Sequence, residues 1–180
     1  MPTFKDATSL QAFLNSQRTG NNTVGFVPTM GALHKGHLAL VTSALSQNEI
    51  VVVSIFVNPT QFGNAGDLKN YPRTLSKDET LLKTLHNDII VFAPNAEDLY
   101  NGNITSNSYN FGAIANEMEG KYRQGHFNGV GTVLELLFDI VKPDYAYFGE
   151  KDFQQLQIVR KLISLTKQPV TIVGCPIYRE

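Results

Sequence analysis

An apolar strand, a glycine-bearing turn and the start of a helix follow one another in the stretch Gly25-Phe26-Val27-Pro28-Thr29-Met30-Gly31-Ala32-Leu33-His34-Lys35-Gly36-His37. Two histidines three residues apart open the helix. This order collects unpaired backbone N–H groups, the positive end of a helix dipole and two imidazoles at one point. The stretch therefore predicts a binding site for a nucleotide triphosphate, whose charge requires such donors.

Further apolar runs of strand length recur along the chain on both sides of this stretch. They are continuous rather than alternating, which is typical of strands buried on both faces of a parallel sheet. Including the first strand, they cover residues 24–28, 50–57, 89–92, 145–148 and 170–173. Segments of helical period lie between them and cover residues 36–47, 75–86, 128–141 and 152–166. This alternation predicts an α/β fold, a doubly wound Rossmann-like parallel sheet with helices on both faces.

Local signals mark the limits of some of these elements. Thr74 directly precedes the helix predicted over 75–86 and is its expected N-cap. Pro143 follows the helix predicted over 128–141 and should end it. Residues 95–111 are polar and without periodicity, so we expect them to be irregular.

Composition places the chain among ordinary single-domain proteins and excludes several classes. It has 180 residues, a net charge of −1 and no block of like charge, so nucleic acid is not an expected partner. Its single cysteine, Cys175, rules out an internal disulfide and fits a reducing cytoplasm. No apolar run approaches the roughly 18 residues of a membrane span. Residues 1–15 lack the uninterrupted apolar core of a signal peptide.

Three predicted strands end in polar, glycine-bearing segments. In an open parallel sheet, ligands bind beyond the carboxyl ends of the strands, so these segments should meet at one edge. The first ends in the histidine pair, and the other two end in Asn58-Pro59-Thr60-Gln61-Phe62-Gly63 and Gly149-Glu150-Lys151-Asp152-Phe153-Gln154-Gln155.

His34 and His37 are neighbours on a helix surface and can face one ligand. The helix dipole disfavours an extra proton there, which keeps an imidazole neutral and able to donate one hydrogen bond. Gly36 lets a phosphate or base approach the backbone. The alternative is that both histidines are simply solvated. A zinc site would need further ligands at metal spacing, and Cys175, His86 and His126 do not supply them.

Uncharged amides and one charged pair make up the other two strand ends. The amides of Asn58 and Gln61 can read the hydroxyls and carboxylate of a small polar substrate, although an Asn-Pro turn alone would also explain them. Lys151 and Asp152 can hold a phosphate and a ribose hydroxyl, although a surface ion pair is the simpler alternative. Gln155 follows in the first turn of the next helix.

Several blocks of the sequence resemble one family, from Gly25 to Arg179. They are Val27-Pro28-Thr29-Met30-Gly31-Ala32-Leu33-His34-x-Gly36-His37, Val53-Ser54-Ile55-Phe56-Val57-Asn58-Pro59-Thr60-Gln61-Phe62, Tyr71-Pro72-Arg73-Thr74, Gly125-His126-Phe127-x-Gly129-Val130 and Phe148-Gly149-Glu150-Lys151-Asp152-Phe153-Gln154-Gln155. This pattern is similar to the pantothenate synthetases (pantoate–β-alanine ligases). The His-x-Gly-His element alone is shared with a wider nucleotidyltransferase superfamily.

The resemblance implies a two-step ligation in which ATP and (R)-pantoate give pantoyl adenylate and pyrophosphate, with Mg²⁺ assisting. β-Alanine then attacks the adenylate to give pantothenate and AMP. The catalytic residues implied are His37, His34 and Lys151. The implied ATP-binding residues are Met30, Gly31, Ala32, Leu33, His34, Lys35, Gly36, His37, Gly149, Glu150, Lys151, Asp152 and Tyr178. Pantoate is expected at Gln61, Asn58 and Gln155, and β-alanine also at Gln61. The metal ligands stay unassigned.

The resemblance also implies a longer protein. The family continues past Glu180 into a phosphate-gripping loop and a small C-terminal domain that closes over the site. Residues 1–180 are therefore expected to be the N-terminal ATP- and pantoate-binding domain without its lid, with reduced or no turnover. A cytoplasmic homodimer is expected. Two alternatives stay open: another adenylate-forming member of the superfamily, and a module that only binds nucleotide or forms a dimer.

Overall fold

A parallel six-stranded sheet forms the centre of the computed structural model, which describes residues 1–178. The strand order is β1-β4-β3-β2-β5-β6, and every neighbouring pair is parallel. Arg179, where the family resemblance ends, lies outside the described residues. The strands are β1 (Thr3–Phe4), β2 (Val24–Thr29), β3 (Ile50–Ile55), β4 (Ile90–Phe92), β5 (Tyr145–Gly149) and β6 (Thr171–Cys175).

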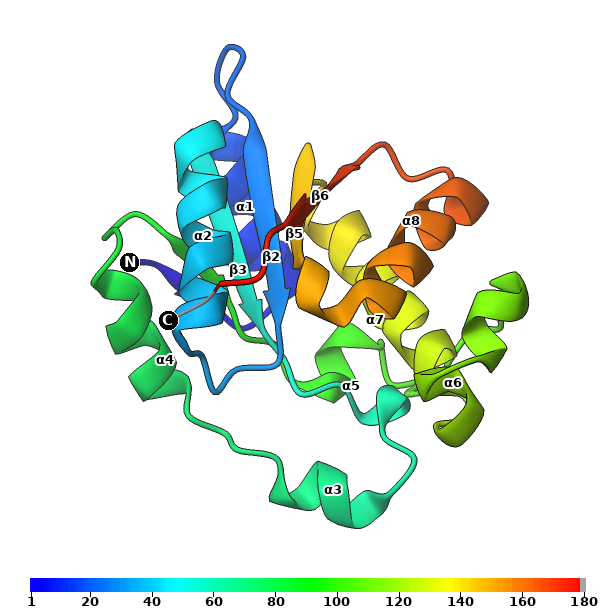
Figure 1. The fold of residues 1–180 in the computed structure, drawn as a ribbon. Helices are drawn as coiled ribbons and strands as arrows, with labels where there is room; N and C mark the ends of the chain where they lie inside the picture. The colour runs from blue at the N-terminus through cyan, green and yellow to red at the C-terminus, as the bar shows by residue number, and fades with distance from the viewer. Residues whose placement is uncertain (179–180) are drawn as a thin grey trace.

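Helices cover both faces of the sheet, as predicted (Figure 1). The longer ones are α1 (Ala7–Gln17), α2 (Lys35–Gln47), α4 (Leu75–Lys83), α7 (His126–Val141) and α8 (Phe153–Thr166). Shorter α-helices are α3 (Ala65–Asn70), α5 (Ala96–Leu99) and α6 (Glu119–Tyr122). The 3₁₀ turns within residues 1–178 are η1 (Pro59–Gln61), η2 (Gly112–Asn116) and η3 (Glu150–Asp152).

Alternate residues of each strand supply two separate cores, because successive strand side chains point to opposite faces. Phe26, Val52 and Phe148 pack with α1, α7 and α8 on one face. Val27, Val53 and Tyr147 are interleaved with them in sequence and pack with α2 and α4 on the other face. Burial on both faces explains why the strands are continuous apolar runs in the sequence. The predicted α/β fold is therefore confirmed.

The strand order reverses direction between β2 and β5. From β2 the chain proceeds through β3 to β4 on one side, and later through β5 to β6 on the other. Such a switch point leaves a crevice outside the carboxyl ends of the two strands that flank it, here β2 and β5. The polar segments predicted to meet at one edge begin there, directly after β2, β3 and β5.

The structure corrects several predicted boundaries. The strand expected over 50–57 ends at Ile55, and the helix expected over 75–86 ends at Lys83. The helix expected from 128 begins at His126, after Gly125 in the left-handed conformation. Thr74 is the N-cap residue of α4, but its hydroxyl donates to Asp78 instead of capping the backbone.

The structure also contains elements that the sequence did not predict. The short strand β1 and the helix α1 precede the first predicted strand, and α5 lies within the segment 95–111 that was expected to be irregular. β1 has two residues and α5 has four, too few for a periodic signal. Within residues 1–178, no helix combines the length and the apolar character that crossing a bilayer requires.

Candidate active site

The first turn of α2 is closed by its own two histidines. His34 is the N-cap, and its Nδ1 accepts the backbone N–H of Gly36 at 3.1 Å. The Nδ1 of His37 accepts the backbone N–H of His34 at 3.3 Å. Because a backbone N–H only donates, both Nδ1 atoms are acceptors, and each neutral ring carries its hydrogen on Nε2. The capping box therefore leaves two Nε2–H donors at the positive end of the helix.

The imidazole of His37 is held neutral. Burial lowers its pKa to about 4, and the neighbouring His34 ring adds to this effect. The carboxylates of Asp78 and Asp152 act in the opposite direction without cancelling it. The two ring centroids lie 4.1 Å apart, so protonation of both rings at once is costly. The neutral form expected from the sequence thus applies to His37, with burial as its main cause.

A buried carboxylate holds the turn between β2 and α2. Asp78, on α4, is only 2% exposed. It accepts the backbone N–H groups of Ala32 at 3.1 Å and of Leu33 at 2.8 Å, and the Thr74 hydroxyl at 3.1 Å. Gly31 and Ala32 both have positive φ, which costs the alanine conformational energy. Asp78 compensates for this strain by satisfying the N–H groups that the turn exposes.

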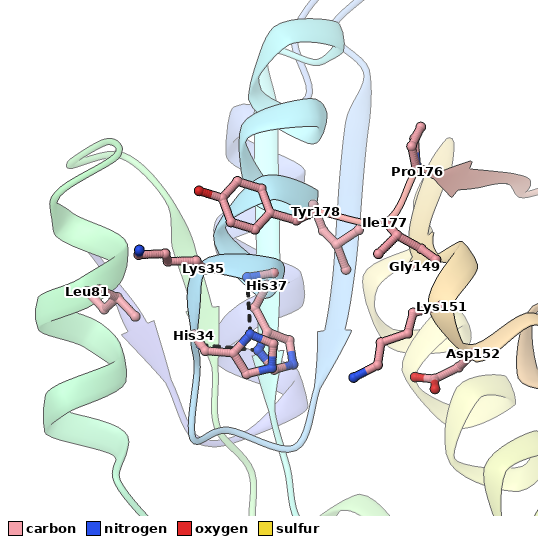
Figure 2. Close-up of a pocket in the computed structure, with 12 residues that line it drawn as sticks. His34, Lys35, His37, Leu81, Gly149, Lys151, Asp152, Pro176, Ile177 and Tyr178 are labelled. Atoms are coloured by element: carbon pink, nitrogen blue, oxygen red, sulfur yellow. Dashed lines mark hydrogen bonds between the residues drawn. The ribbon is translucent and has the colours of Figure 1, made fainter. Parts of the chain in front are cut away.

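A cavity of about 610 Å³ opens beside the N-terminus of α2 (Figure 2). It is called the larger cavity below. Lys151 extends from η3 toward the two imidazoles, and Asp152 lies next to it (Figure 2). Tyr178 lies above the histidines in this view, close to Lys35 (Figure 2). The cavity is lined by His34, Lys35, Gly36, His37, Leu40, Leu81, Gly149, Lys151, Asp152, Pro176, Ile177 and Tyr178.

A second cavity of about 220 Å³, the smaller cavity, lies between the end of β2, the segment that follows β3, the end of β5 and α7. Apolar side chains of α7 make much of its wall, and the amides of Gln61 and Gln155 lie among them. This combination suits a small branched molecule with a few polar groups. The lining is Pro28, Thr29, Met30, His37, Phe56, Asn58, Gln61, Tyr71, Val130, Val133, Leu134, Leu137, Phe148, Asp152 and Gln155.

His37 and Asp152 line both cavities. They lie in α2 and η3, the elements that follow β2 and β5, and these two strands flank the switch point. A molecule in the larger cavity and another in the smaller one would therefore meet beside an Nε2–H donor. Lys151 lines the larger cavity close to this junction. The arrangement can join two bound molecules and stabilise negative charge where they meet.

The structure brings most of the predicted site residues together. His34, Lys35, Gly36, His37, Gly149, Lys151, Asp152 and Tyr178 line the larger cavity, and Asn58, Gln61, Gln155 and Met30 line the smaller one. Gly31 lines a third cavity on the other side of Met30 and Phe56. Ala32, Leu33 and Glu150 line none of these three cavities. Ala32 and Leu33 instead give their N–H groups to Asp78.

Sequence reasoning missed residues that support or line the site. Asp78 is the clearest case, and a signal for it exists, because it lies between Leu75 and Leu82 on the apolar face of α4. Tyr71, quoted in a family block without a role, lines the smaller cavity. Burial and the nearby Asp78 carboxylate raise the pKa of Tyr71, which keeps its hydroxyl neutral.

A metal held by protein ligands alone finds no support in the described part of the chain. Within residues 1–178, no group of three or more His, Cys, Asp or Glu side chains is placed to hold a metal ion. His86 lies in the loop after α4, and Cys175 lies at the end of β6. The zinc alternative is therefore not supported by these residues.

Comparisons with known proteins all point in one direction. The family model described as pantoate-beta-alanine ligase matches residues 2–180. A pantothenate synthetase of Christiangramia forsetii is 54% identical over 180 residues, which is 100% of this chain and 64% of the relative. One of Flavobacterium psychrophilum is 53% identical over 177 residues, covering 98% of this chain and 63% of the relative.

Solved structures agree with these relatives. The crystal structure of pantoate-beta-alanine ligase from Francisella tularensis, complexed with beta-gamma ATP and beta-alanine, matches with a TM-score of 0.93 at 41% identity. The match covers 100% of this chain and 68% of that one. Pantothenate synthetase from Thermus thermophilus matches with a TM-score of 0.90 at 44% identity, covering 100% and 63%.

The chain spans less than two thirds of the length of these two curated relatives. Within that span, the family model extends from the second residue to the last. The sheet, its switch point and the paired cavities belong to the same matched region. By this match over nearly its whole length, the chain belongs to the pantoate-beta-alanine ligase family.

Proposed function

We propose that this chain binds ATP and (R)-pantoate and joins them as pantoyl adenylate, the first step of pantothenate synthesis. The observation that carries the proposal is the meeting of the two cavities at His37 and Asp152. ATP occupies the larger cavity and pantoate the smaller one. The pantoate carboxylate then faces the α-phosphorus of ATP at the junction, which converts an encounter of two molecules into a reaction within one complex.

In the first step, a carboxylate oxygen of pantoate forms a bond to the α-phosphorus. The bond from that phosphorus to the bridging oxygen breaks, and pyrophosphate leaves. Negative charge grows on the phosphoryl oxygens during this transfer. The Nε2–H groups of His34 and His37 and the ammonium of Lys151 are proposed to stabilise it. Because His37 is neutral, it donates a hydrogen bond without transferring its proton.

In the second step, the free amine of β-alanine attacks the acyl carbon of the adenylate and AMP leaves. Gln61 is proposed to contact β-alanine as well as pantoate, because it lies where the smaller cavity meets η1. The Francisella tularensis relative is complexed with beta-gamma ATP and beta-alanine, which supports ATP and β-alanine as substrates. No residue of this chain is assigned as the base for the amine.

The remaining ATP-binding residues are proposed by position. Gly149, Lys35 and Gly36 bring backbone and charge to the larger cavity. Asp152 is proposed to bind a ribose hydroxyl, and the backbone of Tyr178 is proposed to contact the adenine, as the family resemblance implies. Met30, Gly31, Ala32, Leu33 and Glu150 act through the turns that carry these groups.

Pantoate is assigned to the smaller cavity because its shape and chemistry match. The apolar wall formed by Val130, Val133 and Leu134 suits the two methyl groups of pantoate. The amides of Gln61 and Gln155 suit its hydroxyl and carboxylate oxygens. Asn58 lies in the same wall but is only 1% exposed.

Mg²⁺ is proposed to enter with the triphosphate. Within residues 1–178, no group of three or more His, Cys, Asp or Glu side chains could hold a metal ion by itself. This fits Mg²⁺, which usually keeps several waters and binds through phosphates and one or two carboxylates. Asp152 and Glu150 are the carboxylates of η3, beside the larger cavity. When bound, Mg²⁺ neutralises charge on the phosphate oxygens.

The rest of the proposal concerns the whole protein. Residues 1–180 act as the N-terminal substrate-binding domain, and a lid in the remaining third of the relatives' length completes the phosphate site. The lid also shields the adenylate from water. A homodimer in the cytoplasm is proposed from the family resemblance.

Pantoate-dependent exchange of radioactive pyrophosphate into ATP tests the first step. It is measured on the 180-residue chain and on this chain fused to the C-terminal third of the Christiangramia forsetii relative. The fusion is expected to exchange only with (R)-pantoate, and the chain alone more slowly. Calorimetry on the chain alone is expected to detect ATP and (R)-pantoate and not (S)-pantoate.

Two outcomes would contradict the proposal. Exchange supported by another acid instead of pantoate would favour a different adenylate-forming enzyme. ATP binding with no pantoate binding and no exchange by the fusion would favour a module that only binds nucleotide.

A further inference from the structure

Asn58 is a buried polar side chain whose hydrogen-bonding groups are fully used. It follows β3, is 1% exposed, and is the N-cap of η1. Its Oδ1 accepts from the backbone N–H of Thr60 at 3.4 Å, and its Nδ2 donates to the backbone carbonyl of Gly129 at 3.1 Å. A backbone N–H can only donate and a carbonyl can only accept. These two contacts therefore fix which end of the Asn58 amide is oxygen and which is nitrogen.

This orientation dictates the orientation of Gln61. The second hydrogen on Asn58 Nδ2 points at the Gln61 side chain, so an oxygen must face it. Gln61 Oε1 does so at 3.0 Å. Gln61 Nε2 then points the other way, toward Met30 Sδ at 3.2 Å, and sulfur is a weak acceptor. The Gln61 amide therefore presents N–H groups to the smaller cavity.

Tyr100 holds Asn58 in turn from a distant part of the chain. Its hydroxyl donates to Asn58 Oδ1 at 2.6 Å and lies 2.9 Å from the Thr60 hydroxyl. Tyr100 is the C-cap residue of α5 and is 5% exposed, with its ring beside Phe56. In such a buried series of hydrogen bonds, each bond supports the next, because an unpaired polar group would be costly.

The backbone of Gln61 is held independently of its side chain. His126 is 7% exposed, and its Nδ1 lies 3.0 Å from the Gln61 carbonyl oxygen. Since a carbonyl only accepts, this Nδ1 carries the hydrogen. Gly129 lets α7 approach, because a Cβ there would lie 2.4 Å from the Thr60 carbonyl oxygen. With the backbone clamped, the direction of the Gln61 amide depends on Asn58.

We infer that Asn58 and Tyr100 are positioning residues that fix Gln61 as a hydrogen-bond donor toward the smaller cavity, so that this wall selects a ligand atom that accepts. The inference deepens the proposed function and rests on it, since the accepting atom there would be a pantoate oxygen. Asn58 itself contacts no substrate in this arrangement, because both hydrogens on Nδ2 and the oxygen are already engaged.

The test uses isothermal calorimetry of the 180-residue chain with (R)-pantoate and, separately, with MgATP. Asn58→Asp keeps the shape but replaces the donor with a carboxylate, so Gln61 must turn its amide. Affinity for (R)-pantoate is expected to fall by about tenfold, the worth of one hydrogen bond, while affinity for MgATP stays within about twofold. Tyr100→Phe is expected to have a smaller effect of the same sign.

Two further variants separate positioning from a general structural role. In a Gln61→Ala background, Asn58→Asp should cause no additional loss of pantoate affinity, because its effect passes through Gln61. Tyr109→Phe is the matched control, since it removes a tyrosine hydroxyl bonded to Glu135 outside the smaller cavity, and should leave pantoate affinity unchanged. The buried carboxylate of Asn58→Asp could prevent folding. In that case Tyr100→Phe still tests the inference, because it keeps the ring and removes only the hydroxyl.

A readout without pantoate distinguishes failure of this inference from failure of the proposed function. In NMR spectra of the ligand-free chain, the side-chain NH₂ signal of Gln61 is identified by its loss in Gln61→Ala. It should move in Tyr100→Phe and stay in place in Tyr109→Phe. An unmoved signal, or equal losses from Asn58→Asp with and without Gln61, overturns the inference. Absence of pantoate binding by the unmodified chain, with the signal moving as expected, overturns only the proposed function.

Discussion

Asp78 Oδ1 accepts the backbone N–H of Leu33 at 2.8 Å, and the two residues are 45 positions apart in the sequence. The second carboxylate oxygen accepts from Ala32, directly before Leu33. A single buried carboxylate on α4 thus holds the turn that delivers His34 to the start of α2. The positions of the two histidines therefore depend on a residue outside the His-x-Gly-His element.

Asp78→Asn is expected to destabilise the chain and weaken nucleotide binding. The amide offers one accepting oxygen where the carboxylate offers two, so one backbone N–H of the turn loses its partner. The loss should be about 1–3 kcal/mol of unfolding free energy. Urea unfolding measures the stability, and calorimetry with MgATP measures the binding.

The matched control for this change is Asp88→Asn. Asp88 has a side chain that is 91% exposed, and it lies 3.9 Å from the His86 ring. Such a surface group contributes little to stability. Equal unfolding midpoints for Asp78→Asn and Asp88→Asn would show that the buried contacts do not hold the turn.

Gly129→Ala is expected to displace η1 and with it Gln61. The added Cβ would lie 2.4 Å from the Thr60 carbonyl oxygen and 2.7 Å from the Gln61 Cα, and both are backbone atoms that cannot rotate away. Overpacking of this kind typically costs about 1–3 kcal/mol. Gly63→Ala, just after the same turn, meets nothing within 4 Å and serves as the control. Gly129→Ala should lower both the thermal unfolding temperature and the affinity for pantoate. Gly63→Ala should change neither.

Stability should fall as the pH is lowered from about 6.5 toward 4. The pKa of His37 is about 4 in the folded chain, and that of His126 is also lowered, mainly by burial. Between pH 6.5 and 4, these histidines bind protons in the unfolded chain but stay neutral in the folded chain, so acid favours unfolding. Below about pH 4 both states hold the His37 proton, and its contribution stops changing.

Urea midpoints measured across this pH range check the effect. His37→Asn should flatten the slope. Bound triphosphate brings negative charge to the ring and should raise the pKa of His37. Addition of ATP is therefore expected to reduce the acid sensitivity, and an unchanged slope in His37→Asn would contradict the assignment of the low pKa to this residue.

The fold could be predicted from the sequence because burial on both faces of the sheet leaves a strong local pattern. Continuous apolar strands such as β3 and the amphipathic α8 each carry their own signal. β1 carries none, since it has only two residues and is defined by its pairing with the distant strand β4. Long-range contacts of this kind are not encoded in any short window.

The residues of the candidate site likewise fall into those that the sequence predicts and those that it does not. Residues at the strand ends were predictable, because a parallel sheet gathers them at one edge. Asp78 has a signal in the sequence, as a carboxylate on the apolar face of α4, but its partner Leu33 does not follow from that signal. Tyr100 and His126 could not be predicted as supporting residues, since they act through contacts with segments far along the chain. Arg73, quoted in a family block, is also explained only by the structure, where its guanidinium donates to the carbonyls of Leu68, Lys69 and Tyr71.

Lys151→Met is expected to weaken ATP binding without affecting stability. Lys151 is exposed and extends toward the two imidazoles, so its ammonium can reach the phosphates without contributing to the core (Figure 2). Methionine keeps the apolar stem and removes the charge. A lost charged hydrogen bond corresponds to about 1.5–3 kcal/mol, which is roughly a tenfold to hundredfold loss of affinity.

Comparison of two ligands and two lysines locates this effect. Affinity for adenosine should be unchanged in Lys151→Met, because adenosine carries no phosphate. Lys161→Met removes another exposed charge, from α8 and outside both cavities, and should change the affinity for neither ligand. If ATP and adenosine lose affinity equally in Lys151→Met, the residue acts on the nucleoside or on the shape of η3. If only ATP loses affinity, the charge of Lys151 belongs to the phosphate site that begins at His34 and His37.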